Sequence, residues 1–92
     1  MKNVLSKFKK ATDLLTANGI DYLVFGGIAV WAYGRRRKTR DIDLLIRRQD
    51  ADRVLKILKA AGFYTEETDK RWIYKAAIDG VSIDLIFEAK GE

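Results

Sequence analysis

The chain has 92 residues, of which 48% are hydrophobic and 34% charged, and its formal net charge is +5. This length allows one domain with a modest core, and the composition indicates a globular chain with a charged surface. The sequence contains no cysteine and no histidine, which excludes disulfides and histidine catalysis and restricts any metal to ions that accept oxygen ligands, such as Mg²⁺, Mn²⁺ and Ca²⁺.

The first part of the chain predicts a helix, a strand and a second, shorter helix. Apolar residues recur at three- and four-residue steps over residues 3–17, as in an amphipathic helix, and Gly19 suits the left-handed backbone that ends many helices. Residues 20–25 are mostly apolar, β-branched or aromatic, which predicts a strand buried on both faces. A glycine pair breaks this strand, and residues 28–33 predict a short helix.

Residues 35–40 predict a basic loop that leads into a second strand over residues 41–46. Alternation along that strand places Ile42, Leu44 and Ile46 on one face and Asp41, Asp43 and Leu45 on the other. The apolar pattern of residues 50–61 then predicts a third helix, with Asp50 as its N-cap and Gly62 as its stop.

The last part of the chain predicts three strands. Residues 63–66 have a weak strand pattern, and the runs 72–78 and 81–87 are joined by Asp79-Gly80, a dipeptide typical of tight hairpin turns. The order α-β-α-β-α-β-β-β predicts a single domain over residues 1–92 with an α/β (α+β) fold. Because the hairpin requires an antiparallel pair, we expect a small mixed sheet with helices packed on one face.

Three aspartates stand in otherwise apolar strand patterns. Asp41 and Asp43 are two residues apart, so their side chains point the same way, and two adjacent carboxylates repel unless a cation neutralises them. Asp84 lies in the last predicted strand and would join them if that strand neighbours the first pair. The Asp41–Asp43 pair alone and Asp84 alone are each more often solvated polar residues. The prediction of a cation site therefore depends on all three aspartates together.

The predicted junction between the first strand and the short helix has features of a phosphate site. Gly26 and Gly27 lack side chains and allow close approach of a ligand, and a helix N-terminus offers unpaired N–H groups to a phosphate. The basic loop that follows could contact a triphosphate or a nucleic-acid backbone. Most glycine pairs are simple turns, and most basic runs are solvated loops.

Together, Gly26-Gly27-Ile28-Ala29 and the run from Gly34 to Leu44 resemble the nucleotidyltransferase superfamily, which has the fold of DNA polymerase beta. The resemblance is closest to the minimal nucleotidyltransferases and AbiEii-like toxins, and it covers roughly residues 20–87. It implies that Asp41, Asp43 and Asp84 are the metal-binding and catalytic acids. It also implies that Gly26, Gly27, Arg37 and Thr39 bind the nucleotide.

The resemblance further implies an Mg²⁺- or Mn²⁺-dependent enzyme. It would move a nucleoside monophosphate from an NTP to a hydroxyl group on a protein, an RNA or a small molecule, by in-line attack on the α-phosphate. Transfer to a partner protein or to tRNA, as in toxin–antitoxin pairs, is favoured over antibiotic modification. The alternative is a non-catalytic module of the same fold that binds nucleic acid or a partner, for example as a toxin–antitoxin component.

The sequence leaves several properties open. It has neither a signal-peptide pattern nor an apolar run long enough to span a bilayer, so we expect a cytoplasmic protein without a membrane partner. A homo-oligomer or a hetero-partner is compatible with its aromatic residues. The base of the NTP, the acceptor and the oligomeric state are undetermined. The chain is expected to be either a minimal catalytic domain or one truncated at its C-terminus.

Overall fold

The computed structural model describes residues 2–25 and 41–88, which form a five-stranded sheet and two α-helices. The helices are α1 (Lys2–Ala17) and α3 (Ala51–Ala60), and a short 3-10 helix, η1 (Arg48–Asp50), leads into α3. The strands are β1 (Tyr22–Phe25), β2 (Asp41–Ile46), β3 (Tyr64–Asp69), β4 (Ile73–Ile78) and β5 (Val81–Ile86). The predicted short helix over residues 28–33 and the basic loop over residues 35–40 lie outside the described residues.

The sheet is mixed, as the sequence predicts. Its strand order is β1-β2-β5-β4-β3. The central pair β2 and β5 is parallel, and the other three pairs are antiparallel. The last strand of the chain, β5, thus lies beside β2, so that residues about forty positions apart in the chain become direct neighbours.

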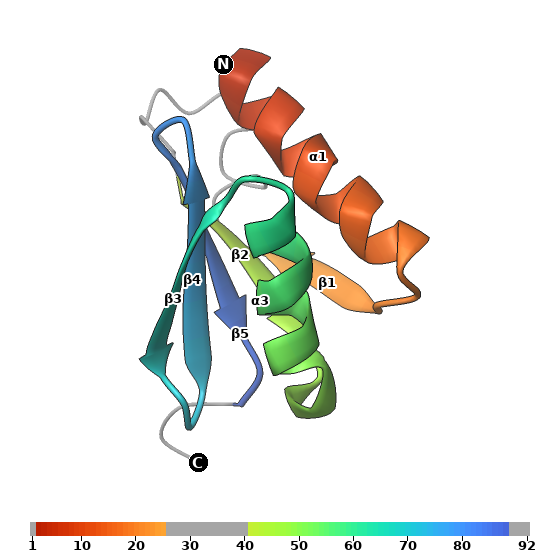
Figure 1. Cartoon of the computed structure of the whole chain (residues 1–92), viewed down its shortest axis with the longest axis vertical. Coiled ribbons are helices and arrows are strands. Elements are labelled where there is room, and N and C mark those ends of the chain that lie inside the picture. Colours follow the sequence, from red (N-terminus) through yellow and green to blue (C-terminus); the bar gives the residue numbers. More distant parts are fainter. Residues whose placement is uncertain (1, 26–40, 89–92) are drawn as a thin grey trace.

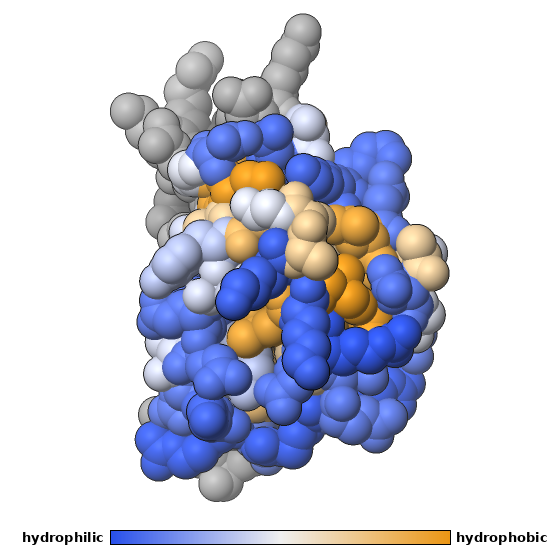
Figure 2. Space-filling model, viewed as in Figure 1, coloured by the Kyte–Doolittle hydropathy of each residue, from blue (hydrophilic) through white to orange (hydrophobic). Residues whose placement is uncertain are grey.

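The core lies between the sheet and the two helices, which cover the same face of the sheet (Figure 1). The largest fully buried side chains are Leu15, Ile42, Leu44, Val54, Leu58, Ile83 and Leu85. Each of them stabilises the fold by roughly 1.5–3 kcal/mol relative to exposure to water. The outer surface of this helical layer is mainly hydrophilic, with some hydrophobic surface visible between the helices (Figure 2).

Left-handed backbone conformations end the helices and form the hairpin at the predicted positions. Gly19 and Gly62, which follow α1 and α3, have φ angles of 73° and 99°. Asp79 and Gly80, between β4 and β5, have φ angles of 49° and 80°, which is the pattern of a type I′ hairpin turn. Asp50 stands at the N-cap position of α3, but its side chain makes no capping hydrogen bond, because η1 leads into the helix through residues that are already helical.

The prediction that residues 20–25 are buried on both faces is wrong. Strand β1 lies at an edge of the sheet and pairs only with β2 among the described strands. Leu23, which is 66% exposed, faces away from the core, because its partner Leu45 belongs to the side of the sheet opposite the helices. The apolar run of β1 therefore indicates a strand without indicating full burial.

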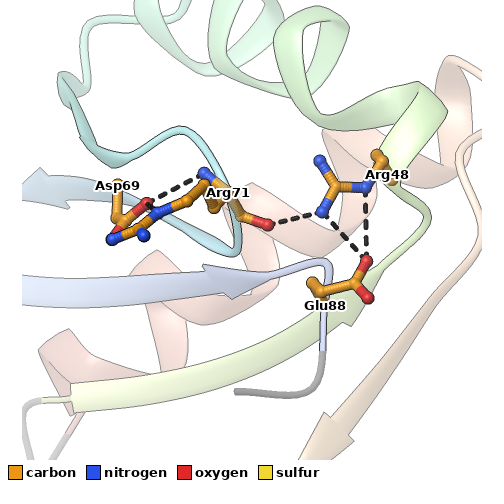
Figure 3. Close-up of polar contacts among 4 residues, drawn as sticks. All are labelled: Arg48, Asp69, Arg71 and Glu88. Atoms are coloured by element: carbon orange, nitrogen blue, oxygen red, sulfur yellow. Dashed lines mark hydrogen bonds and ion pairs between the residues drawn. The ribbon is translucent and has the colours of Figure 1, made fainter. Parts of the chain in front are cut away.

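Arg48 joins three segments at the end of the sheet from which β5 leaves (Figure 3). Its guanidinium donates to Oε1 of Glu88 at 2.9 Å and to the backbone carbonyl of Arg71, and it lies 5.4 Å from the centre of the Phe87 ring. Arg71 in turn donates three hydrogen bonds to the carboxylate of Asp69, one from its backbone N–H and two from its guanidinium. These contacts fix the start of α3 against the β3–β4 turn and the end of β5.

The helices in residues 2–25 and 41–88 include none that is long and apolar enough to span a membrane.

Candidate active site

The face of the sheet opposite the helices carries a row of charged residues. Asp43 on β2, Asp84 on β5, Lys75 on β4 and Glu66 on β3 are successive backbone partners across four strands. Because directly paired residues share a face of the sheet, all four side chains belong to this open face. Helices α1 and α3 lie on the other side (Figure 1), so these residues can reach a ligand there.

Asp43 and Asp84 are placed side by side by the parallel pairing of β2 and β5. The apolar residues that alternate with them, among them Ile42, Leu44 and Ile83, are fully buried under the helices and so fix which way the aspartates point. Neighbouring strands are about 4.8 Å apart, a separation at which two carboxylates repel each other. The prediction that the last strand neighbours the Asp41–Asp43 strand is confirmed, and the pairing sets Asp84 beside Asp43.

Oδ1 of Asp84 is a buried carboxylate oxygen that accepts no hydrogen bond from the described part of the chain. The ammonium group of Lys75 lies 3.3 Å from this oxygen, close enough for an ion pair. At this distance the two charges attract, but the ammonium group is not aligned for a hydrogen bond to Oδ1. Lys75 is therefore a charge partner that leaves the lone pairs of Oδ1 unsatisfied.

This donor set suits a hard divalent cation. Two adjacent carboxylates, one with an oxygen that lacks a hydrogen bond, are the kind of ligands that Mg²⁺ and Mn²⁺ prefer. Within residues 2–25 and 41–88, however, no group of three acidic side chains gathers to form a metal site. The structure describes the backbone of Asp41, which opens β2 opposite Ser82. The three-carboxylate metal site therefore stays a prediction.

The predicted nucleotide-binding residues Gly26, Gly27, Arg37 and Thr39 lie outside the described residues. The described strands nevertheless indicate where this segment leaves and re-enters the sheet. β1 ends at Phe25, whose backbone partner is Asp43, and β2 begins at Asp41. The glycine pair therefore follows directly on a residue that is paired with one of the candidate acids.

Lys75 is the residue of this site to which the sequence assigned no role. The signal that could have found it is the turn Asp79-Gly80. In a two-residue hairpin the flanking residues pair outward in order, so Ile78 pairs with Val81 and, three positions further out, Lys75 pairs with Asp84. Counting outward from the turn is enough to place the lysine beside the third candidate acid.

The sequence and the fold of the chain match known proteins. The model of a protein family described as "Uncharacterised nucleotidyltransferase" matches residues 2–89. A search of curated proteins found no match to the chain. The AbiEii-like subtype is not confirmed and remains a prediction.

Two solved structures are similar in fold. A proposed nucleotidyltransferase from Thermotoga maritima has a TM-score of 0.71 and 16% identity, over 95% of this chain and 57% of its own length. ANT(2")-Ia, in complex with adenylyl-2"-tobramycin, has a TM-score of 0.74 and 21% identity, over 100% of this chain and 54% of its own. The chain thus spans little more than half of either protein, and at these identities the likeness concerns the fold.

Proposed function

The chain belongs to this nucleotidyltransferase family, and from that premise we propose that it is a metal-dependent enzyme that transfers a nucleoside monophosphate from an NTP to a hydroxyl group. The observation that carries the proposal is the direct pairing of Asp43 with Asp84 on the open face of the sheet. Two neighbouring carboxylates on one face of a sheet supply the oxygen ligands that a divalent cation prefers, and nucleotidyl transfer uses such a cation to offset the charge of the triphosphate.

Asp43 and Asp84 would hold Mg²⁺ or Mn²⁺, together with Asp41 at the start of β2. When bound, the metal supplies positive charge that offsets the charge of the triphosphate and of the leaving pyrophosphate. In the reaction, the acceptor oxygen forms a bond to the α-phosphorus, and the bond from the α-phosphorus to the bridging oxygen breaks. Asp84 would take the proton of the acceptor hydroxyl, a role supported by its position directly beside Asp43 on the open face.

The remaining predicted residues would bind the nucleotide. Gly26 and Gly27 would cradle the phosphates, and Arg37 and Thr39 would contact them from the segment that returns to β2. The position of Phe25, directly before the glycine pair and opposite Asp43, supports this assignment for Gly26 and Gly27.

The acceptor is proposed only as a class, namely a hydroxyl group of a protein, an RNA or a small molecule. ANT(2")-Ia is similar to this chain in fold and was solved with a nucleotidylated small molecule. The present chain spans about half of that protein, so its acceptor has to be found by experiment. Among these classes an RNA is our first choice, because the chain carries a formal net charge of +5 and a basic surface attracts polyanions.

The test is a titration of each labelled NTP into the protein with and without Mg²⁺. We compare the wild type with Asp43→Asn and with the control Asp13→Asn, which changes an exposed aspartate of α1. We expect NTP binding that depends on Mg²⁺, that is lost in Asp43→Asn and that is kept in Asp13→Asn. If the wild type binds no NTP under either condition, the proposal is wrong, and a non-catalytic module that binds nucleic acid or a partner replaces it.

A further inference from the structure

The side chain of Lys75 stands between two acids on the open face. Its backbone pairs with Asp84 on one side and with Glu66 on the other, and its ammonium group is 3.3 Å from Oδ1 of Asp84. The side chain of Asp84 is 22% exposed, whereas that of Lys75 is 46% exposed. The lysine therefore reaches from the solvent side to a largely buried carboxylate.

Oδ1 of Asp84 needs a positive neighbour. It is buried, it accepts no hydrogen bond from the described residues, and its strand neighbour is Asp43. A buried carboxylate without hydrogen bonds and beside a second acid is destabilised unless a cation compensates it. Lys75 is the cation that the structure places against this oxygen.

We propose that Lys75 is a resident counter-ion of Asp84 that competes with the divalent cation for Oδ1. The inference rests on the proposed function, since it concerns the same metal-binding carboxylate. Lys75 is thus a positioning residue: it keeps Asp84 compensated before the metal arrives, and it raises the metal concentration that the site requires.

The competition follows from charge and from space. A metal ion that coordinates Oδ1 comes close to the point from which Lys75 approaches the same oxygen, and two cations at such a distance repel each other strongly. The lysine can withdraw at low cost, because its ammonium sits on a flexible four-carbon stem and is half exposed. Its other cross-strand neighbour, the exposed Glu66, offers a second carboxylate to the displaced ammonium.

This arrangement predicts effects of opposite sign for two neighbouring substitutions. Lys75→Met keeps the length of the side chain and removes its charge, so the metal meets no competitor at Oδ1. Glu66→Gln removes the alternative partner of the lysine, so Lys75 stays with Asp84 more of the time. In a chain that already carries Lys75→Met, Glu66→Gln loses most of its effect, because the lysine through which it acts is gone.

The experiment measures the affinity of the full chain for Mn²⁺ alone, without nucleotide, from the electron paramagnetic resonance signal of the free ion. Lys75→Met is expected to bind Mn²⁺ more tightly than the wild type, on the order of tenfold for one like charge removed at a partly exposed site. Lys75→Arg, which keeps the charge, is expected to stay near the wild type. If Lys75 had a purely structural role, its replacement would not tighten Mn²⁺ binding. Unchanged or weaker Mn²⁺ binding by Lys75→Met therefore overturns the inference.

Asp84→Asn separates failure of this inference from failure of the proposed function. If Mn²⁺ binds the wild type, is lost in Asp84→Asn and is unaffected by Lys75→Met, the metal site stands and the competition is refuted. If Mn²⁺ binds neither the wild type nor Lys75→Met, the metal site itself is refuted and the inference with it. Lys75→Gln serves as a second neutral variant, and circular dichroism checks that each variant is folded.

Discussion

The hydroxyl of Tyr74 on β4 donates a hydrogen bond to Oδ1 of Asp52 in the first turn of α3, at 2.8 Å. The tyrosine ring is buried in the core and packs edge-on against Phe87, with ring centres 4.9 Å apart. Burial, the hydrogen bond to Asp52 and the charge of Asp52 raise the pKa of Tyr74 from 10.0 to about 12. This contact ties helix α3 to the sheet whose other face carries the candidate acids.

The raised pKa makes the stability of the fold depend on alkaline pH. The unfolded chain releases the Tyr74 proton near pH 10.0 and the folded chain near pH 12, so the folded state holds the proton more tightly. The contribution of Tyr74 to the free energy of unfolding is present in full below pH 10.0 and is lost as pH rises towards about 12.

The measurement compares the wild type with Tyr74→Phe in urea unfolding at several pH values. Tyr74→Phe is expected to lower the free energy of unfolding by about 1 kcal/mol at neutral pH. The difference should shrink as pH rises above 10.0. Tyr64→Phe, which removes an exposed hydroxyl, controls for the loss of a phenol. A difference between wild type and Tyr74→Phe that is constant with pH would contradict the pKa assignment.

Asp84→Asn is expected to separate activity from stability. We expect nucleotidyl transfer to fall by about 100-fold or more, as for the loss of one key electrostatic group in a site. The free energy of unfolding should change by no more than about 1 kcal/mol, because the neutral amide relieves the repulsion with Asp43 while Lys75 loses its partner. Steady-state transfer and chemical denaturation of the same preparation provide both readouts; a large loss of stability would mean that Asp84 is needed for the fold.

Arg48→Ala is expected to destabilise the fold by roughly 1–2 kcal/mol, because Arg48 combines the Phe87 ring contact with hydrogen bonds to Glu88 and to the Arg71 carbonyl. The neighbouring Arg47→Ala is the matched control, since Arg47 makes an exposed ion pair with Asp21 and should contribute less than about 0.5 kcal/mol. Urea midpoints of both variants measure the contrast. Equal effects would show that the contacts in Figure 3 do not stabilise the end of the sheet.

Gly80→Ala is expected to destabilise the β4–β5 hairpin by about 1 kcal/mol, because φ at this position is 80° and a β-carbon disfavours left-handed backbone. Asp79→Asn is the control. Asparagine tolerates the left-handed conformation as well as aspartate does, and the change removes only the partly exposed ion pair with Lys7. Thermal unfolding of both variants tests the prediction, which fails if Asp79→Asn costs as much as Gly80→Ala.

The local patterns of the chain were enough to predict most of the elements. The repeat of apolar residues over 3–17 predicts helix α1, the alternation over 41–46 coincides with β2, and Asp79-Gly80 marks the hairpin. These features depend on residues a few positions apart, and such residues interact in the same way whatever the rest of the fold does. The exposure of β1 at the sheet edge could not be predicted, because burial depends on which elements cover a strand.

For the candidate site, the sequence by itself determined that Asp43 and Asp84 alternate with core residues, so that their side chains point to the face of the sheet opposite the core. It also determined, through the two-residue turn, that Lys75 pairs with Asp84. Only the tertiary structure decided that β5 lies parallel to β2, in the register that sets Asp43 against Asp84. The physical reason is that strand order and register depend on contacts between distant segments, made when β2 and β5 bury their apolar faces under the same two helices.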